Sequence, residues 1–178
     1  MKLSLFSAMA AAVLIAAQLT SARAADDATP PMPTVGEKAP QFTLPSQDGT
    51  PVSLTDFKGK WVVVYFYPRD MTPGCTIEAH NFQNSLPQFE AKHAVILGVS
   101  VDSKESHQQF CAKDSLTFKL LSDTEHMVVS AYGSLGGFNG MAMANRNTFL
   151  IDPKGKVYKV WTKVNPATSA SDVLSALP

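Results

Sequence analysis

The sequence predicts an α/β fold in which a mixed central sheet is flanked by helices on both faces. Two runs rich in Val, Ile and aromatic residues, 61–67 and 94–101, are typical of strands buried on both sides. Segments with helical features follow both runs, and a hairpin pattern centred on residues 152–155 comes later. Strands that alternate with helices and then continue into a hairpin predict a sheet with parallel and antiparallel pairs.

The first 24 residues have the pattern of a secretory signal peptide. Lys2 gives a positive start, residues 3–17 are almost wholly apolar, and Ala22-Arg23-Ala24 is a small-x-small cleavage site. A membrane anchor fits less well, because the apolar run is shorter than the ~20 residues that a spanning helix needs. We therefore expect cleavage after Ala24, a periplasmic or secreted protein, and no membrane association afterwards.

Residues 25–35 form a Pro-rich leader, and residues 36–178 form the predicted domain. Cleavage leaves about 154 residues, enough for one domain with its own core. The signal peptide contains two basic residues and no acidic ones, so the mature chain has a net charge of about −2. Because no basic stripe is present to neutralise phosphates, we expect no nucleic-acid partner.

In the first half of the domain, short strands are expected at 41–44 and 52–54, on either side of an Asp-Gly turn. The buried strand 61–67 follows. Residues 76–92 predict a helix, because apolar side chains recur on one face. Pro87 indicates a break in this helix near Ser85.

In the second half, the buried strand 94–101 leads to a helix that runs to about residue 113 and carries Cys111. A short strand at 118–121 precedes another helix, which ends near residue 132. The candidate N-caps are Asp102 or Ser103 for the first helix and Asp123 or Thr124 for the second.

The last part of the chain is expected to begin with a glycine-rich loop at 136–140. Strands at 147–151 and 157–161 then form the predicted hairpin, and a helix at 169–177 closes the domain.

Cys75 lies where a strand end meets a helix start. Unpaired N–H groups and the positive end of the helix dipole gather there, and both favour the thiolate, which is the nucleophilic form of cysteine. Pro68 ends the strand, and its ring can shield the sulfur from water. The Thr72 hydroxyl can both accept and donate, so it can hold an oxygen of a peroxide beside the sulfur. Arg146 is the candidate cation for charge that develops on a leaving oxygen.

The segment 65–79, YFYPRDMTPGCTIEA, resembles the active-site segment of the peroxiredoxin Q (bacterioferritin comigratory protein) family. Residues 120–123 and 146–155 also match family segments, and the similarity extends from about Val35 to the C-terminus. The resemblance implies a thioredoxin-like fold and a thiol peroxidase that reduces H₂O₂ or organic hydroperoxides without metal, haem or flavin. It also implies that Cys75 is the peroxidatic cysteine, surrounded by Pro68, Thr72 and Arg146. A thioredoxin-like or other thiol reductant and a monomeric state are expected in the same way.

The sequence departs from many relatives at position 80. Where they place a second, resolving cysteine five residues after the first, this chain has His80. Other family members carry that cysteine on a later helix, so we expect Cys111 to attack the Cys75 sulfenic acid and form an intramolecular disulfide. If the two sulfurs lie far apart when reduced, the first turn around Cys75 must unwind, because a disulfide needs Cα atoms within ~7 Å. A one-cysteine enzyme resolved by an external thiol is the alternative.

Two other functions remain open. The first is an exported thiol–disulfide carrier, although such proteins normally need Cys-x-x-Cys and this chain has Glu78 three residues after Cys75. The second is a binding domain stapled by a Cys75–Cys111 disulfide, which would contribute roughly 3–4 kcal/mol. Glu78 is expected to complement the helix dipole and to orient an active-site group. The four histidines are expected to be surface or helix-face residues, because no spacing resembles a zinc site.

Overall fold

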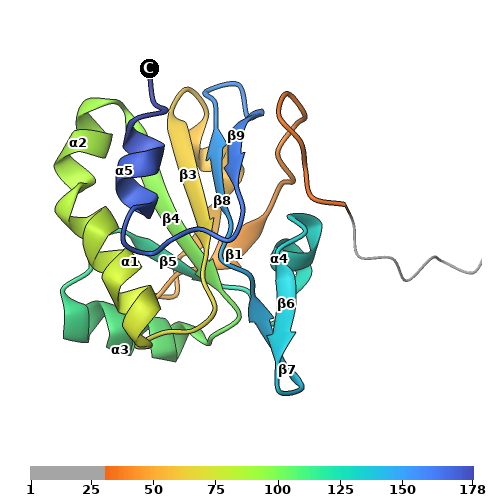
Figure 1. Cartoon of the computed structure of the whole chain (residues 1–178), viewed down its shortest axis with the longest axis vertical. Helices are drawn as coiled ribbons and strands as arrows, with labels where there is room; N and C mark the ends of the chain where they lie inside the picture. The colour runs from red at the N-terminus through yellow and green to blue at the C-terminus, as the bar shows by residue number, and fades with distance from the viewer. Residues whose placement is uncertain (1–30) are drawn as a thin grey trace, which may run out of the picture.

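The computed structural model describes residues 31–178; the predicted signal peptide and most of the predicted leader lie outside the described residues. One five-stranded sheet, in the order β5-β4-β3-β8-β9, runs through the centre (Figure 1). Its middle strand β3 (Trp61–Phe66) is parallel to β4 (Ala94–Ser100), which is parallel to β5 (Lys119–Ser122). On its other side β3 is antiparallel to β8 (Thr148–Ile151), which pairs with β9 (Val157–Trp161). The predicted mixed α/β sheet is therefore confirmed.

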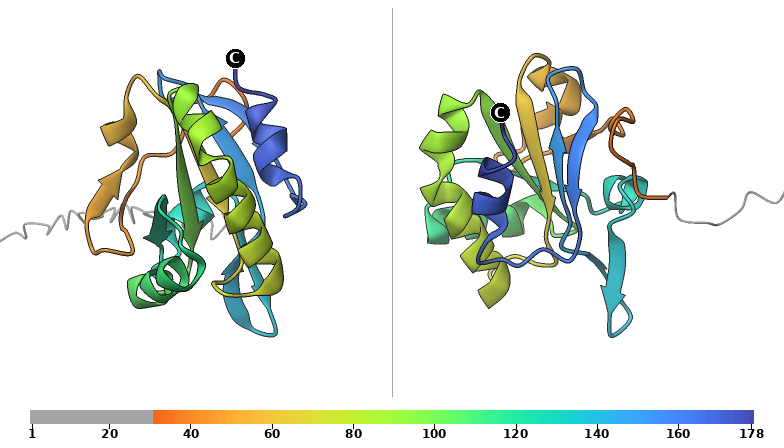
Figure 2. Two further views of the ribbon diagram at one scale, coloured as in Figure 1. Left: turned by 90° about the vertical axis from the view of Figure 1, so that its left-hand side faces the viewer. Right: turned by 45° about the horizontal axis from the view of Figure 1, so that its top comes forward.

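One face of the sheet is covered by α1 (Pro73–Asn84), α2 (Leu86–Ala91) and α5 (Ser169–Leu174), as Figure 2 shows. Helix α3 (Lys104–Asp114) packs along β5 and contributes to the same core. This core is rich in aromatic rings, and Tyr65 of β3 stacks between two of them at centroid distances of 4.6 and 5.5 Å. Both cysteines belong to this core.

The opposite face is covered by β1 (Thr43–Pro45), β2 (Pro51–Ser53), the 3₁₀ helix η1 (Leu54–Phe57) and α4 (Met127–Ala131). Helices therefore lie on both faces, as predicted. None of the helices within residues 31–178 combines the length and apolar character needed to cross a bilayer.

The predicted helix break near Ser85 is confirmed, because Ser85 caps the end of α1 and Pro87 lies in the first turn of α2. Helix α1 begins at Pro73, three residues earlier than expected, since proline is well tolerated in a first helical turn. Ser103 is the N-cap of α3 and accepts the amide of Ser106. Asp123 is not the cap residue of α4, but its carboxylate accepts the amides of Met127 and Val129 at 3.1 and 2.7 Å.

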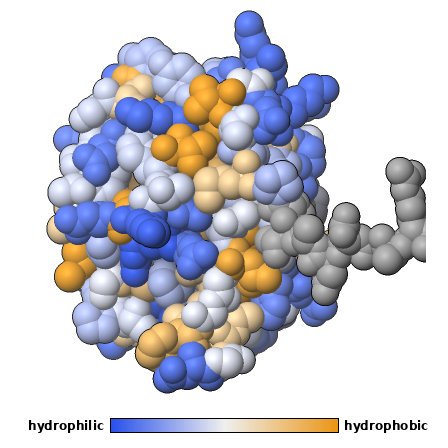
Figure 3. Space-filling model, turned by 45° about the vertical axis from the view of Figure 1, so that its right-hand side comes forward, coloured by the Kyte–Doolittle hydropathy of each residue, from blue (hydrophilic) through white to orange (hydrophobic). Residues whose placement is uncertain are grey.

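The prediction of a loop at 136–140 is wrong. Strands β6 (Leu135–Phe138) and β7 (Met141–Ala144) form a hairpin that projects from the body of the protein (Figure 1). Its turn residues, Asn139 and Gly140, both have positive φ, which is the backbone that two-residue hairpins prefer. The Asn-Gly pair is therefore the hairpin signal that the glycine content of this segment obscured. Apolar surface lies at the tip, where Phe138 and Met141 are exposed (Figure 3).

Candidate active site

Cys75 is the third residue of α1, directly after the loop that follows β3. Thr72 is the N-cap, and the first-turn amides of a helix have no intrahelical acceptor. The Cys75 thiol is free and only 1% exposed. The positive end of a twelve-residue helix favours negative charge at this position.

Arg146 is the cation that lies beside Cys75. Its Nη2 donates to Cys75 Sγ at 3.3 Å, and its side chain is 16% exposed. The two residues meet across 71 positions of sequence because β8 lies antiparallel beside β3, with Thr148 paired to Tyr65. The residue just before β8 is therefore brought to the end of β3, where α1 begins.

Glu78 orients this arginine. It lies one turn after Cys75 on α1, is completely buried, and forms an ion pair with Nη1 of Arg146. Burial raises the pKa of Glu78 to about 7, against the opposing effect of the Arg146 charge. Burial alone would lower the pKa of Arg146, but the neighbouring Glu78 and Cys75 raise it, so the guanidinium stays charged. Glu78 thus holds the guanidinium in place, but it lies beyond the first turn of α1, where it was expected to complement the helix dipole.

Thr72 and Pro68 frame the approach to the helix. The Thr72 hydroxyl donates to the Arg69 carbonyl at 3.0 Å, so its oxygen lone pairs are available to accept a hydrogen bond. Pro68 is half-buried and lines a small hollow that Met141 and Met143 of β7 also line. Both residues belong to the loop between β3 and α1.

Cys111 lies in the last turn of α3, in the same core as Cys75. Its thiol is free and 9% exposed. Burial, together with the negative charge of Asp70, raises the pKa of the Cys111 thiol to about 11. In this conformation Cys111 is therefore protonated at neutral pH.

His107 is a helix-face histidine rather than a surface one: it is completely buried on α3 and lies 2.8 Å from the Asp70 carboxylate. The signal was its spacing, four residues before Cys111, which places both side chains on one face of the predicted helix. His80 is exposed and pairs with Asp114 at 3.0 Å.

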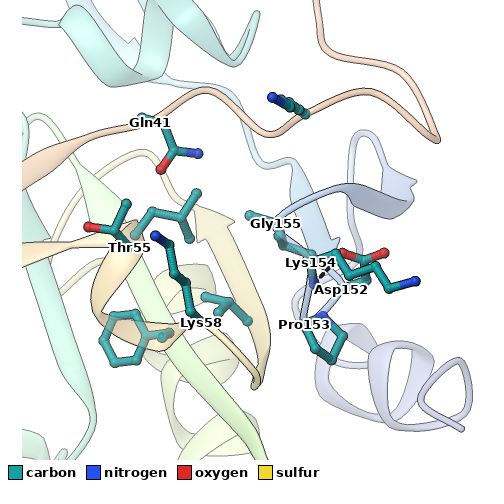
Figure 4. A pocket seen from close by; sticks show the side chains of 12 residues that line it. Gln41, Thr55, Lys58, Asp152, Pro153, Lys154 and Gly155 are labelled. Carbon is teal, nitrogen blue, oxygen red and sulfur yellow. Dashed lines mark hydrogen bonds between the residues drawn. The ribbon is translucent and has the colours of Figure 1, made fainter.

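A hollow of the described protein lies away from these residues. It has a volume of about 480 Å³ and lies between η1 and the β8–β9 turn, where Lys58 projects among Gln41, Thr55 and Gly155 (Figure 4). It is not lined by Cys75, Cys111 or the residues that contact them. Within residues 31–178, no three His, Cys, Asp or Glu side chains gather as a metal site would require.

The chain shows clear similarity to known proteins. The AhpC/TSA family model matches residues 35–160. Over 147 residues the chain is 44% identical to Peroxiredoxin Bcp of Bacillus subtilis, which covers 80% of this chain and 94% of the relative.

Solved structures show the same relationship. Peroxiredoxin Q of Xanthomonas campestris superposes with a TM-score of 0.73 at 41% identity, over 76% of this chain and 89% of that one. A second structure from the same organism describes the alkyl peroxide reduction activity of its bacterioferritin comigratory protein. It superposes with a TM-score of 0.75 at 38% identity, over 81% of this chain and 97% of that one.

Proposed function

Because the chain belongs to the AhpC/TSA family and, within it, to the Bcp or peroxiredoxin Q group of thiol peroxidases, we propose that Cys75 and Cys111 carry its catalytic cycle. The observation that carries the proposal is the buried Cys75 sulfur at a helix N-terminus, 3.3 Å from a guanidinium nitrogen of Arg146. The substrates are H₂O₂ and organic hydroperoxides; the relative from Xanthomonas campestris described for alkyl peroxide reduction supports the second class.

In the first step the Cys75 thiolate attacks one oxygen of the peroxide. The S–O bond forms as the O–O bond breaks, and the other oxygen leaves as water or an alcohol after taking up a proton. The sulfur becomes a sulfenic acid. Arg146 donates to the sulfur and is placed to stabilise the negative charge that passes to the leaving oxygen.

Thr72 orients the substrate in this proposal. Since its hydroxyl hydrogen is given to the Arg69 carbonyl, its oxygen is available to accept the O–H of the incoming peroxide. Pro68 narrows the same approach and limits the water that reaches the sulfur.

In the second step Cys111 attacks the sulfenic sulfur, displaces hydroxide and forms the Cys75–Cys111 disulfide. The buried Cys111 thiol, with a pKa of about 11, is a poor nucleophile in the closed conformation. Local unwinding at the start of α1, which brings the sulfurs together and exposes Cys111 to solvent, therefore precedes this step.

An external dithiol, from a thioredoxin-like protein or another thiol reductant, then reduces the disulfide. If the N-terminal 24 residues are a signal peptide, this reductant acts in the periplasm or outside the cell. We propose that the mature enzyme is a monomer with no nucleic-acid or membrane partner, and the mass of the exported protein tests both cleavage and oligomeric state. Nothing in the site favours the thiol–disulfide carrier, because Glu78 occupies the position of the second thiol and is paired with Arg146.

The cycle is tested by counting free thiols after one equivalent of H₂O₂ is added to the reduced protein. The wild type should lose two thiols rapidly, Cys111→Ser should lose one and stall as a sulfenic acid, and Cys75→Ser should lose none. Unchanged steady-state turnover of Cys111→Ser with a dithiol reductant would remove Cys111 from the mechanism and leave the one-cysteine enzyme.

A further inference from the structure

We propose that a buried hydrogen-bond cluster ties the loop before Cys75 to α3 and keeps Cys75 close to Cys111 while the first turn of α1 unwinds. The cluster consists of Tyr67, Asp70, Ser106 and His107, and we call it the Asp70 tether. The inference rests on the proposed resolving role of Cys111. It assigns Asp70 and His107 as positioning residues for disulfide formation.

The Asp70 carboxylate is the centre of the tether. Its Oδ1 accepts the hydroxyl of Tyr67 at 2.7 Å, and its Oδ2 accepts the hydroxyl of Ser106 at 2.7 Å. Nδ1 of His107 lies 2.8 Å from the same Oδ2. Asp70 is 5% exposed and His107 is completely buried. A loop residue is thus bound to two consecutive residues of α3.

The other ends of the tether are also anchored. Nε2 of His107 lies 3.1 Å from the Leu121 carbonyl, and it must carry a hydrogen because a carbonyl only accepts. The Asp70 amide donates to the Asp102 carboxylate at 2.8 Å, which joins the loop to the segment between β4 and α3. The cluster therefore connects the loop, α3 and β5 as one unit.

Stability alone does not account for such a cluster. Well-packed apolar side chains of similar volume stabilise a core at least as well as a buried charged pair. A fully partnered polar network differs from apolar packing because it holds one arrangement of its members. The arrangement held here places the loop that precedes the peroxidatic cysteine on the helix that carries the second cysteine.

The length of chain between Cys75 and its last fixed contact sets how strongly the tether affects disulfide formation. Cys75 lies five residues after Asp70, so with the tether closed and α1 locally unwound its Cα stays within about 17 Å of Asp70. Cys111 lies one helical turn, about 6 Å along the axis, beyond His107. Once Asp70 loses its side-chain bonds, only its amide bond to Asp102 still holds the loop. When that bond opens as well, the last sheet bond before Cys75 is that of the Tyr67 amide to Val99, eight residues away.

Effective concentration falls roughly as the −3/2 power of the free chain length. Lengthening the free segment from five to eight residues therefore lowers the effective concentration of the Cys75 sulfur at Cys111 by about 2-fold. Loss of the fixed orientation of the loop on α3 adds to this. Disulfide formation should slow by at least about 2-fold when the tether is broken.

The test separates the two chemical steps. Reduced Asp70→Asn is mixed with H₂O₂, and rapid-quench mass spectrometry follows the sulfenic acid and then the Cys75–Cys111 disulfide. We expect the first rate to change by less than about 2-fold and the second to fall by at least that factor. Over-oxidation to sulfinic acid at high peroxide should rise, because the sulfenic acid lives longer.

A matched control uses the same substitution on α3. Asp114→Asn removes the charge that pairs with the exposed His80 of α1 and leaves the tether intact. It should form the disulfide at the wild-type rate. If Asp114→Asn slowed disulfide formation as much as Asp70→Asn, general contact between α1 and α3 would explain the effect, and the tether would be refuted.

Ser106→Ala removes only one bond to Asp70 at a half-buried position, so it serves if Asp70→Asn does not fold. It should slow the second step in the same direction by a smaller factor. If the folded variants form the disulfide at the wild-type rate, or lose as much in sulfenic acid formation as in disulfide formation, the tether is refuted. The proposed catalytic cycle is not affected by either result. If the wild type forms no Cys75–Cys111 disulfide, the proposed resolving step fails first and the tether fails with it.

Discussion

Replacing Arg146 by Gln tests how much of the peroxidase rate depends on the fixed cation. Arg146 is placed to stabilise both the Cys75 thiolate and the charge that develops on the leaving oxygen. Removing one preorganised donor of this kind typically costs about 3–4 kcal/mol of transition-state stabilisation. We therefore expect the second-order rate constant of Cys75 oxidation to fall by about 10²–10³-fold.

The same substitution has a smaller effect on stability than the loss of most buried ion pairs. Breaking such a pair usually costs about 3–5 kcal/mol, because a buried charge is left without a partner. Glu78, however, already has a pKa of about 7, and loss of the arginine raises that pKa further. At neutral pH Glu78 can therefore take up a proton and become neutral. We expect a loss of about 1–2 kcal/mol in the free energy of unfolding, measured by urea titration.

The rate is measured in a single turnover, with reduced enzyme in excess over H₂O₂, so that recycling does not contribute. Arg146→Lys is the matched comparison, because it keeps the charge but cannot bond to Glu78 and Cys75 through two fixed nitrogens. It should recover part of the rate. A folded Arg146→Gln protein that reacts within about 3-fold of the wild type would refute the role of this cation, since 3-fold corresponds to under 1 kcal/mol.

Three further predictions concern neighbouring residues. Glu78 has a raised pKa in the folded state, so it favours folding at low pH, and that contribution is lost as pH rises from about 4.5 to 7. Relative to Glu78→Gln, the wild type should lose up to about 3 kcal/mol of unfolding free energy across this range in urea titrations. The same pH dependence of stability in both proteins would contradict the pKa shift. Thr72→Val should lower the rate of peroxide reduction by about 10-fold with little change in melting temperature, whereas Thr72→Ser should retain the rate; equal rates for both would show that the hydroxyl has no role. Tyr65→Phe should stabilise the protein by about 1 kcal/mol, because the buried Tyr65 hydroxyl has no hydrogen-bond partner among the described residues; a lower melting temperature would reveal a partner.

Much of the fold could be predicted because its signals are local. The density of β-branched residues in β3 and β4, and the proline after Ser85, act within a few residues of where they occur. The β6–β7 hairpin was missed because its glycines suggested a loop, while the Asn139-Gly140 turn signal came without alternating flanking residues. The start of α4 was missed because its N-cap is His126, while the Asp123 carboxylate accepts first-turn amides from across an intervening turn.

The spacing of His107 from Cys111 places both on one helix face, but the groups that bind His107 could not be predicted from its own helix. Its partners are a loop residue 37 positions earlier and a carbonyl of β5, and neither is near it in sequence. Exposed and buried histidines have similar local sequence, so only the packing of α3 against the sheet distinguishes His107 from His80.

The sequence by itself determined where Cys75 lies, because a buried strand, a proline, a turn and a helix follow one another within some fifteen residues and need only short-range forces. Only the tertiary structure decided which charges meet there. The strand order places β8 beside β3, and this pairing brings Arg146 to both Cys75 and Glu78. The tertiary structure also decided that the loop before Cys75 is bound to α3. Contacts over such separations in sequence depend on how the whole sheet assembles, because no local propensity encodes them.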